Sequence, residues 1–214
     1  MHTKFSSVLS EVNSVAIGDS HADLVLKNCS LINVYTKEIQ EKIQISIKHD
    51  RIAFIGEDAS HTIGPKTKTL DVKNKFVCPS FVDPHIHIDH FLTPAEFVKR
   101  SLLCGVTSLF PDSIDIVSVC GYRGFKEFLK QTQNLPMRFF HTIPGGLPVD
   151  RKFSHGRTLT HKEEKQAINL DSIVGLGEVF SWIKVTKRDA KTIKSLKQMH
   201  ENNCIINGLS LIHI

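Results

Sequence analysis

The chain has 214 residues, 41% of them hydrophobic, which is enough for one sizeable core or for one domain and part of another. Its net charge of +5 comes from 27 Lys and Arg against 22 Asp and Glu, and the basic residues are scattered, which gives little support for a nucleic-acid-binding protein. No apolar run approaches the ~20 residues that span a bilayer, so we expect neither nucleic-acid nor membrane partners.

The cysteines indicate a reducing compartment. They are odd in number, widely spaced and free of any CxxC pair, which is typical of reduced, buried thiols rather than of a disulfide scaffold or zinc ribbon. We therefore expect a cytoplasmic protein. The five residues are Cys29, Cys78, Cys104, Cys120 and Cys204.

The first part of the chain predicts a small β unit. Residues 1–22 contain no continuous apolar block, so we expect an N-terminal extension without a secretory signal. Between residues 23 and 75, short β-rich runs follow one another closely, with His49-Asp50 as a turn between two of them. This pattern predicts a small antiparallel sheet, part of a β-sandwich domain.

From residue 76 to residue 208 the pattern becomes strand, loop, helix, repeated. The first helix, expected over 94–104, has Thr93 at its cap, Pro94 at its first position and Glu96 three residues after the cap. Thr160 and Glu163 introduce a later helix in the same way. The other expected helices cover 122–133 and the stripe Ile193, Leu196 and Met199, and the expected strands cover 106–110, 137–143, 173–179 and 204–206.

Such alternation favours an α/β fold with a parallel sheet, either doubly wound or a (β/α)₈ barrel. No strand is followed by a GxGxxG or Walker-type glycine fingerprint, which favours the barrel. An eight-unit barrel typically needs ~250 residues, so residues 76–208 are expected to form only its first half.

Two histidines at strand spacing suggest a metal site. His85 and His87 follow the apolar run from Phe76, and side chains two residues apart on a strand project to the same face. Active sites of barrels lie at the carboxyl ends of the strands, where both imidazoles can reach one transition-metal ion. The alternative is a pair of hydrogen-bonded, metal-free histidines on a polar strand end.

Glu178 follows an apolar strand, where an unpaired buried carboxylate would be costly and a metal ion would remove that cost. The alternative is a glutamate that faces solvent or caps a helix. Together, His85, His87 and Glu178 predict one or two metal ions that lower the pKa of a bound water, as in a hydrolytic site.

Weaker candidates for the site remain. Asp83 either supports a ligand or forms a turn before Pro84, and Asp89 and His90 could reach the pocket rim. His141 is a ligand or a satisfied polar end group, and Asp112 and Asp115 shape the pocket or cap the next helix.

The chain resembles the start of the amidohydrolase superfamily, which combines a small β-sandwich with a metal-binding barrel. The stretches that carry this resemblance are Asp23 to Asn28, Asp50 to Gly56, and Pro79-Ser80-Phe81-Val82-Asp83-Pro84-His85-Ile86-His87. Within the superfamily it is most similar to the bacterial-type adenine deaminases. The matching motifs are Leu92-Thr93-Pro94, the loop Pro144-Gly145-Gly146-Leu147-Pro148 and the strand Gly175-Leu176-Gly177-Glu178-Val179.

This resemblance implies a binuclear site with manganese or iron rather than zinc, in which His85 and His87 bind one metal and Glu178 bridges both. Metal-bound hydroxide would attack the purine carbon that bears the amino group, converting adenine to hypoxanthine and ammonia. The purine base is then the small-molecule partner, and a homo-oligomer is compatible with the full-length protein. The catalytic residues are expected in the later strands, so none is assigned among these 214.

Two departures from the family pattern concern the substrate. The family has glutamate and two serines where this chain has Asp89-His90-Phe91, and it has a pocket histidine at the position of Ile114. Another aminopurine or a cyclic amide therefore remains open as the substrate, as does a non-catalytic scaffold with the same fold.

The last six residues, Leu209-Ser210-Leu211-Ile212-His213-Ile214, leave the family pattern after Gly208. They match the translation of a transposase adapter used in DNA library preparation, so we expect residues 209–214 to be a non-native tail. We expect the 214-residue chain itself to lack deaminase activity, because the remaining ligands and the catalytic aspartate would lie in later strands.

Overall fold

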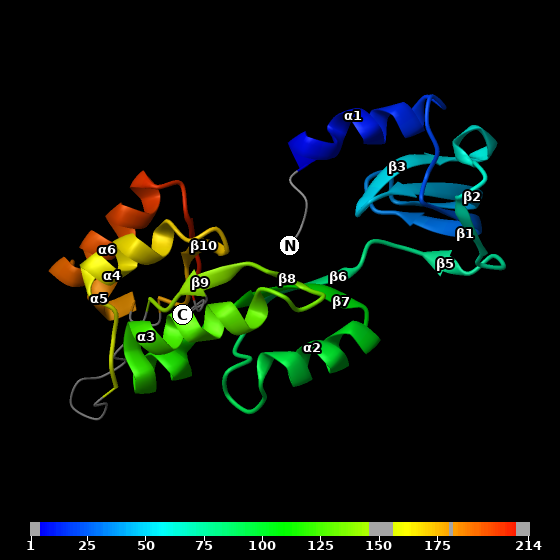
Figure 1. The fold of residues 1–214 in the computed structure, drawn as a ribbon. Coiled ribbons are helices and arrows are strands. Elements are labelled where there is room, and N and C mark those ends of the chain that lie inside the picture. Colours follow the sequence, from blue (N-terminus) through cyan, green and yellow to red (C-terminus); the bar gives the residue numbers. More distant parts are fainter. Residues whose placement is uncertain (1–4, 146–155, 180–181, 209–214) are drawn as a thin grey trace. The chain divides into compact units, whose positions relative to one another are not determined.

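The computed structural model describes residues 5–145, 156–179 and 182–208, and the chain divides into two compact units, Met1–Pro79 and Ser80–Ile214 (Figure 1). The end of the loop expected at 144–148 and the whole tail expected at 209–214 lie outside the described residues.

The first unit is a five-stranded sheet with α1 (Phe5–Ala16) packed against it. The strand order is β3-β2-β1-β4, with β5 also paired to β1. The strands are β1 (Leu24–Asn33), β2 (Glu38–Lys48), β3 (Arg51–Gly56), β4 (Lys68–Asp71) and β5 (Phe76–Val77), and a 3₁₀ turn covers Ser60–Thr62.

The expected antiparallel pairing holds for β1, β2 and β3, with the His49-Asp50 turn between β2 and β3. His49 has a φ of 54°, which closes this tight turn. β4 and β5 were not among the strands predicted for this sheet, and both run parallel to β1, so the prediction of a purely antiparallel sheet was wrong. β1 is ten residues long, so its second edge has room for two short strands, β4 along its first half and β5 further on.

Helix α1 lies within the region expected as an extension, and it contributes to the core of this unit. Val8, Val12 and Val15 recur at helical spacing and are all buried. Val15 packs with Val25 and Ala59, which are also fully buried. The apolar face of α1 is therefore covered by the sheet.

The second unit contains parallel strands in the order of the chain. They are β6 (Phe81–Ile86), β7 (Val106–Pro111), β8 (Arg138–Phe139), β9 (His141–Ile143), β10 (Ile173–Leu176) and β11 (Ile205–Ile206). β6, β7 and β8 pair side by side, as do β9, β10 and β11. The two sets join where β8 leads into β9, because Phe140 N–H donates to Leu109 O and Asp112 bridges to Thr142. The parallel α/β pattern predicted from the sequence is confirmed.

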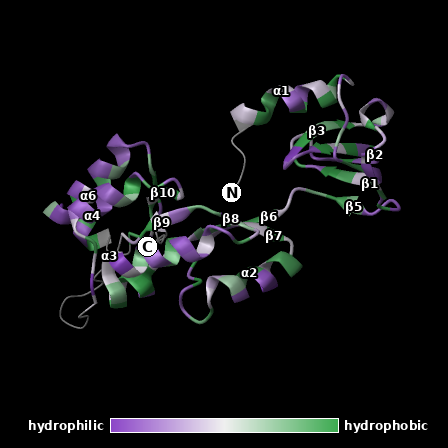
Figure 2. Cartoon of the chain, in the orientation of Figure 1, coloured by the Kyte–Doolittle hydropathy of each residue, from purple (hydrophilic) through white to green (hydrophobic). Residues whose placement is uncertain are grey.

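The helices of this unit are α2 (Pro94–Leu103), α3 (Ile114–Thr132), α4 (His161–Ile168), α5 (Trp182–Thr186) and α6 (Ala190–Glu201). The predicted caps are confirmed, since the hydroxyl of Thr93 accepts from Glu96 N–H and Thr160 forms a full capping box with Glu163. Figure 2 shows that α4 and α6 are mainly hydrophilic, as expected for helices with one face in solvent.

Two predicted boundaries were wrong by several residues. α3 starts at Ile114 rather than at 122, because a bend at Gly121, with a φ of 63°, joins two helical segments. β10 ends at Leu176, so Gly177 and Glu178 lie in the irregular segment that follows it. The short helix α5 was not predicted.

Two apolar clusters fill the second unit. One centres on Phe125, Ile143 and Met199, and the other on Leu109, Val98 and Phe128. All five cysteines are unpaired, but only Cys29 is buried; three are exposed, so the prediction of buried thiols was wrong for these. Within the described ranges, no helix combines the length and the apolar character needed to cross a membrane.

Candidate metal centre

The carboxyl end of β6 brings His85 and His87 together. His85 lies within the strand and His87 directly follows its last residue, Ile86. Their Nε2 atoms are 3.2 Å apart and their rings meet edge to face at 84°. The strand spacing therefore produces the shared face expected from the sequence.

Glu178 reaches these histidines from beyond β10. Its Oε1 atom lies 2.6 Å from His85 Nε2 and 3.7 Å from His87 Nε2, and the residue is only 5% exposed. β7 and the consecutive strands β8 and β9 lie between β6 and β10. In a flat sheet, β6 and β10 would therefore be three strand spacings of ~4.8 Å apart, roughly 14 Å. The contact between Glu178 and His85 therefore indicates a sheet that curves toward this end.

The donor set fits a transition-metal ion. The three candidate ligand atoms, one from each residue, all lie within 4.8 Å of one another. A tetrahedral ion with bonds of ~2.1 Å spaces its ligands ~3.4 Å apart, which is close to the 3.2 Å between the two Nε2 atoms and the 3.7 Å between His87 Nε2 and Glu178 Oε1. The 2.6 Å between His85 Nε2 and Glu178 Oε1 is a hydrogen-bond distance, so these two groups would move slightly apart around an ion. Among the described residues, no other group of three His, Cys, Asp or Glu side chains gathers in this way.

The second ring nitrogens set the orientation of the histidines. His87 Nδ1–H donates to the backbone carbonyl of Asp112 at 2.8 Å, which leaves His87 Nε2 with a lone pair. Asn207, after β11, places its side-chain nitrogen 3.3 Å from His85 Nδ1. Sequence reasoning missed Asn207; the available signal was its position at the carboxyl end of the fifth predicted strand.

Asp112 follows β7 and is completely buried. Its Oδ2 accepts the backbone N–H of Glu178 at 2.6 Å, whereas Oδ1 has no hydrogen-bond partner. Burial raises the pKa of this carboxyl to about 7. A Cβ at position 177 would overlap the carboxylate, so glycine is required between β10 and Glu178. Sequence reasoning placed Asp112 near the pocket, but missed Gly177.

The other candidates surround this centre without adding to the ligand group. Asp83 Oδ1 accepts the backbone N–H of His85, and Asp89 Oδ2 accepts that of Ile116. Burial also raises the pKa of Asp89. His90 stacks on His87 with a ring separation of 5.0 Å, and its Nε2 lies 2.8 Å from Asp115 Oδ2; it is 38% exposed. His90 thus lies at the rim of the site, whereas the Asp89 carboxylate hydrogen-bonds the backbone of α3 rather than any of the three candidate ligands.

His141, weighed as a ligand or as a satisfied polar end group, lies away from the centre. Its ring is fully buried, stacks on Phe139, and has Nε2 2.9 Å from the Thr132 hydroxyl. That hydroxyl donates to Leu129 O, so His141 Nε2–H is the donor to Thr132 and Nδ1 remains without a partner. Burial lowers the pKa of His141 to about 3, so the ring is a neutral core group.

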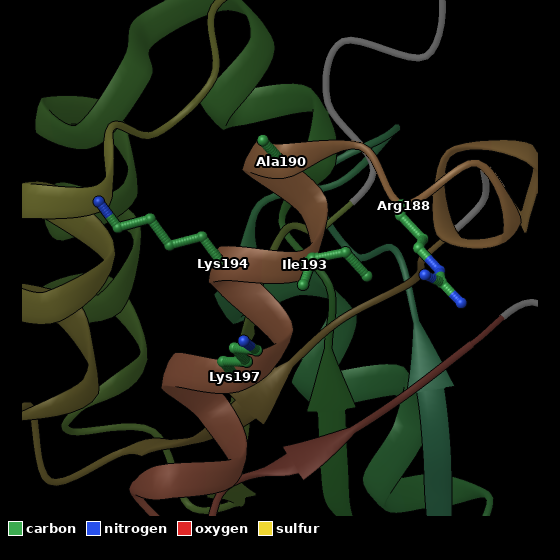
Figure 3. A pocket seen from close by; sticks show the side chains of 5 residues that line it. All are labelled: Arg188, Ala190, Ile193, Lys194 and Lys197. Carbon is green, nitrogen blue, oxygen red and sulfur yellow. The ribbon is translucent and has the colours of Figure 1, made fainter.

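A separate hollow lies over α6 and the turn before it. Arg188, Ile193, Lys194 and Lys197 line it together with Ala190, and none of the candidate ligands does. Figure 3 shows that Lys194 and Arg188 point to opposite sides, so their charges do not converge on one ligand.

Comparison with known proteins supports a common origin with one enzyme family. The chain is 51% identical over 203 residues to a protein of Cenarchaeum symbiosum named adenine deaminase, covering 95% of this chain and 33% of that protein. It is 32% identical over 194 residues to an adenine deaminase of Clostridium acetobutylicum, covering 90% of this chain and 33% of the relative. The chain thus spans about a third of the length of these relatives. No family model matches it.

Solved structures show the same fold at low sequence identity. A β-aspartyl dipeptidase of Fervidobacterium islandicum aligns with a TM-score of 0.55 and 15% identity, covering 84% of this chain and 46% of that one. An adenine deaminase structure aligns with a TM-score of 0.51 and 18% identity, covering 85% and 48%. The curated relatives that match this chain are named adenine deaminase. The solved structures that share its fold include an adenine deaminase and a β-aspartyl dipeptidase.

Proposed function

We propose that this chain is the metal-binding part of a hydrolytic deaminase that converts adenine to hypoxanthine and ammonia. The observation that carries the proposal is the meeting of His85, His87 and Glu178 at the carboxyl ends of β6 and β10. The 51% identity to a protein named adenine deaminase supports the substrate class.

The side chains of the centre have distinct roles in this proposal. His87 would hold the ion through Nε2, because the Asp112 carbonyl keeps the ring proton on Nδ1. His85 would hold it through Nε2 once its ring proton is on Nδ1, with the Asn207 amide turned so that its oxygen accepts that proton. Glu178 supplies the carboxylate oxygen that balances the charge in a buried place. A bound divalent metal supplies a Lewis acid and lowers the pKa of a bound water.

We further propose a binuclear centre of manganese or iron rather than zinc. Imidazole nitrogen and carboxylate oxygen are donors that Fe(II), Mn(II) and zinc all accept, so the choice of manganese or iron rests on the resemblance to the adenine deaminases. One oxygen of Glu178 would face each ion, and the second ion would take further ligands from the part of the relatives that this chain does not span.

The curvature that brings Glu178 onto His85 supports the first half of a barrel, which the sequence predicted over residues 76–208, although β5 at 76–77 pairs in the first unit. We also propose that the sheet over residues 23–75 is part of a β-sandwich. The barrel strands would then continue beyond β11. We expect the chain alone to release no ammonia from adenine, because the catalytic groups would lie on those later strands.

A chimera tests the proposed reaction. This chain replaces the matching third of the Cenarchaeum symbiosum relative, and ammonia release is measured with adenine, other aminopurines and cyclic amides. We expect adenine to be the preferred substrate, and His85→Ala and Glu178→Gln chimeras to be inactive. An active parent relative beside an inactive but folded, metal-loaded chimera would refute the proposal, and preference for a cyclic amide would replace adenine as the substrate.

A further inference from the structure

We propose that the carboxylate of Asp112 is the positioning group that locks the candidate metal centre by joining the ends of three strands. The inference rests on the proposed metal site and concerns a residue that contacts two of its ligands without binding the ion itself.

The contacts of Asp112 reach every element that carries a ligand. Its N–H donates to Ile86 O at 2.9 Å, next to both histidines on β6, and its carbonyl accepts from His87 Nδ1–H. Its Oδ2 accepts the N–H of Glu178, which lies 66 residues further along the chain. One residue at the end of β7 thus contacts both His87 and Glu178.

Of the contacts that Asp112 makes, only the one with Glu178 uses its side chain, so a substitution can remove it. Glu178 is 5% exposed, so its N–H would be buried without an acceptor if the Asp112 side chain were removed. Such a loss would free Glu178 to move away from His85 Nε2, which is now 2.6 Å from its Oε1. It would also release the backbone of residue 112, whose carbonyl fixes the lone pair of His87 Nε2.

The neighbouring chain is shaped around this side chain. A Cβ on Gly177 would overlap the Asp112 carboxylate, so the glycine before Glu178 permits the contact. Gly177 N–H donates to Ile143 O at 2.7 Å, which keeps this segment against β9. The backbone of Gly177 therefore holds the Glu178 N–H close to the Asp112 carboxylate.

Asp89 provides a matched control. Like Asp112, it is a carboxylate near the end of a strand, accepts one backbone N–H through Oδ2, and has an Oδ1 atom without a partner. Its N–H donor is Ile116, which is not a ligand. Removal of either carboxylate should disturb folding, but only removal of Asp112 should disturb the metal centre specifically.

The test measures Mn²⁺ affinity of the purified chain by electron paramagnetic resonance of the free ion, with circular dichroism to verify folding. Asp112→Ala should weaken Mn²⁺ binding by about 10–100-fold, the cost typical of groups that orient metal ligands. Asp112→Asn, whose amide oxygen still accepts the Glu178 N–H, and Asp89→Ala should stay within about threefold of the parent on the same scale. Gly177→Ala, which displaces the carboxylate without removing it, should reproduce the loss.

An Asp112→Ala chain that binds Mn²⁺ like the parent, or an Asp89→Ala or Asp112→Asn chain that loses as much affinity, overturns the inference. If the parent itself binds no Mn²⁺, the proposed metal site fails, and hydrogen exchange of the Glu178 amide then decides the inference separately. Faster exchange in Asp112→Ala than in Asp112→Asn and the parent supports the lock, and equal exchange in all three overturns it. If Asp112→Ala does not fold, Asp112→Asn and Gly177→Ala decide it in the same way.

Discussion

Replacement of His141 by leucine should make the second unit markedly less sensitive to mild acid. The ring is fully buried, and its pKa falls from an ordinary 6.5 to about 3 because the charged form would lose its hydration. A folded-state pKa below the unfolded value means that the unfolded chain binds the proton first. The contribution of His141 is therefore fully present above pH 6.5 and is lost as the pH falls toward 3.

The magnitude follows from the two pKa values. The full difference corresponds to about 5 kcal/mol, and the part lost between pH 7.5 and pH 5.0 is about 2 kcal/mol. Leucine fits the same surroundings, because the ring packs on Phe139 and Phe128, and the Thr132 hydroxyl retains its bond to Leu129 O.

Urea unfolding at the two pH values provides the measurement. Helices α2 to α6 all belong to the second unit, so the helical signal in far-UV circular dichroism mainly follows the unfolding of that unit. Protonation of carboxylates at pH 5.0 lowers the free energy of unfolding equally in both proteins. The difference between the losses of the parent and of His141→Leu therefore reports the histidine alone. We expect the parent to lose about 2 kcal/mol more than the variant. Equal losses would show that the ring is charged or hydrated in the folded chain, and replacement of the exposed His200 by glutamine should leave the parent's loss unchanged.

Three further predictions concern local contacts and the metal centre. Thr160→Ala removes the capping box of α4 and should cost about 1 kcal/mol in urea unfolding; an unchanged midpoint would contradict the role of the cap. Thr62→Val leaves the buried Ser46 hydroxyl without its 2.7 Å partner and should cost about 1–3 kcal/mol, whereas a stabilised first unit would show that Ser46 finds another acceptor. Addition of Mn²⁺ at about 100 times its Kd should raise stability by about 2.7 kcal/mol, and a chelator should reverse this. His87→Ala should abolish the effect, and a persistent shift in that variant would place the ion elsewhere.

Local signals in the sequence predicted local structure well. The caps at Thr93 and Thr160 depend on residues three apart, and the hairpin at His49-Asp50 depends on adjacent ones, so each is determined over a few residues. The start of α3 was harder to predict, because the bend at Gly121 interrupts its apolar periodicity. The parallel course of β4 and β5 depends on which edge of β1 is free, which no local pattern records.

The sequence by itself determined the strand spacing that puts His85 and His87 on one face, and it marked Glu178 as a carboxylate beside a buried strand. Only the tertiary structure decided that Glu178 reaches His85, because that contact depends on the curvature of a sheet whose intervening strands all contribute to it. The same holds for Asp112, whose contacts with Ile86, His87 and Glu178 join segments up to 66 residues apart. Periodicity predicts which side of a strand a residue occupies, whereas the distance between strand ends depends on the packing of the whole sheet.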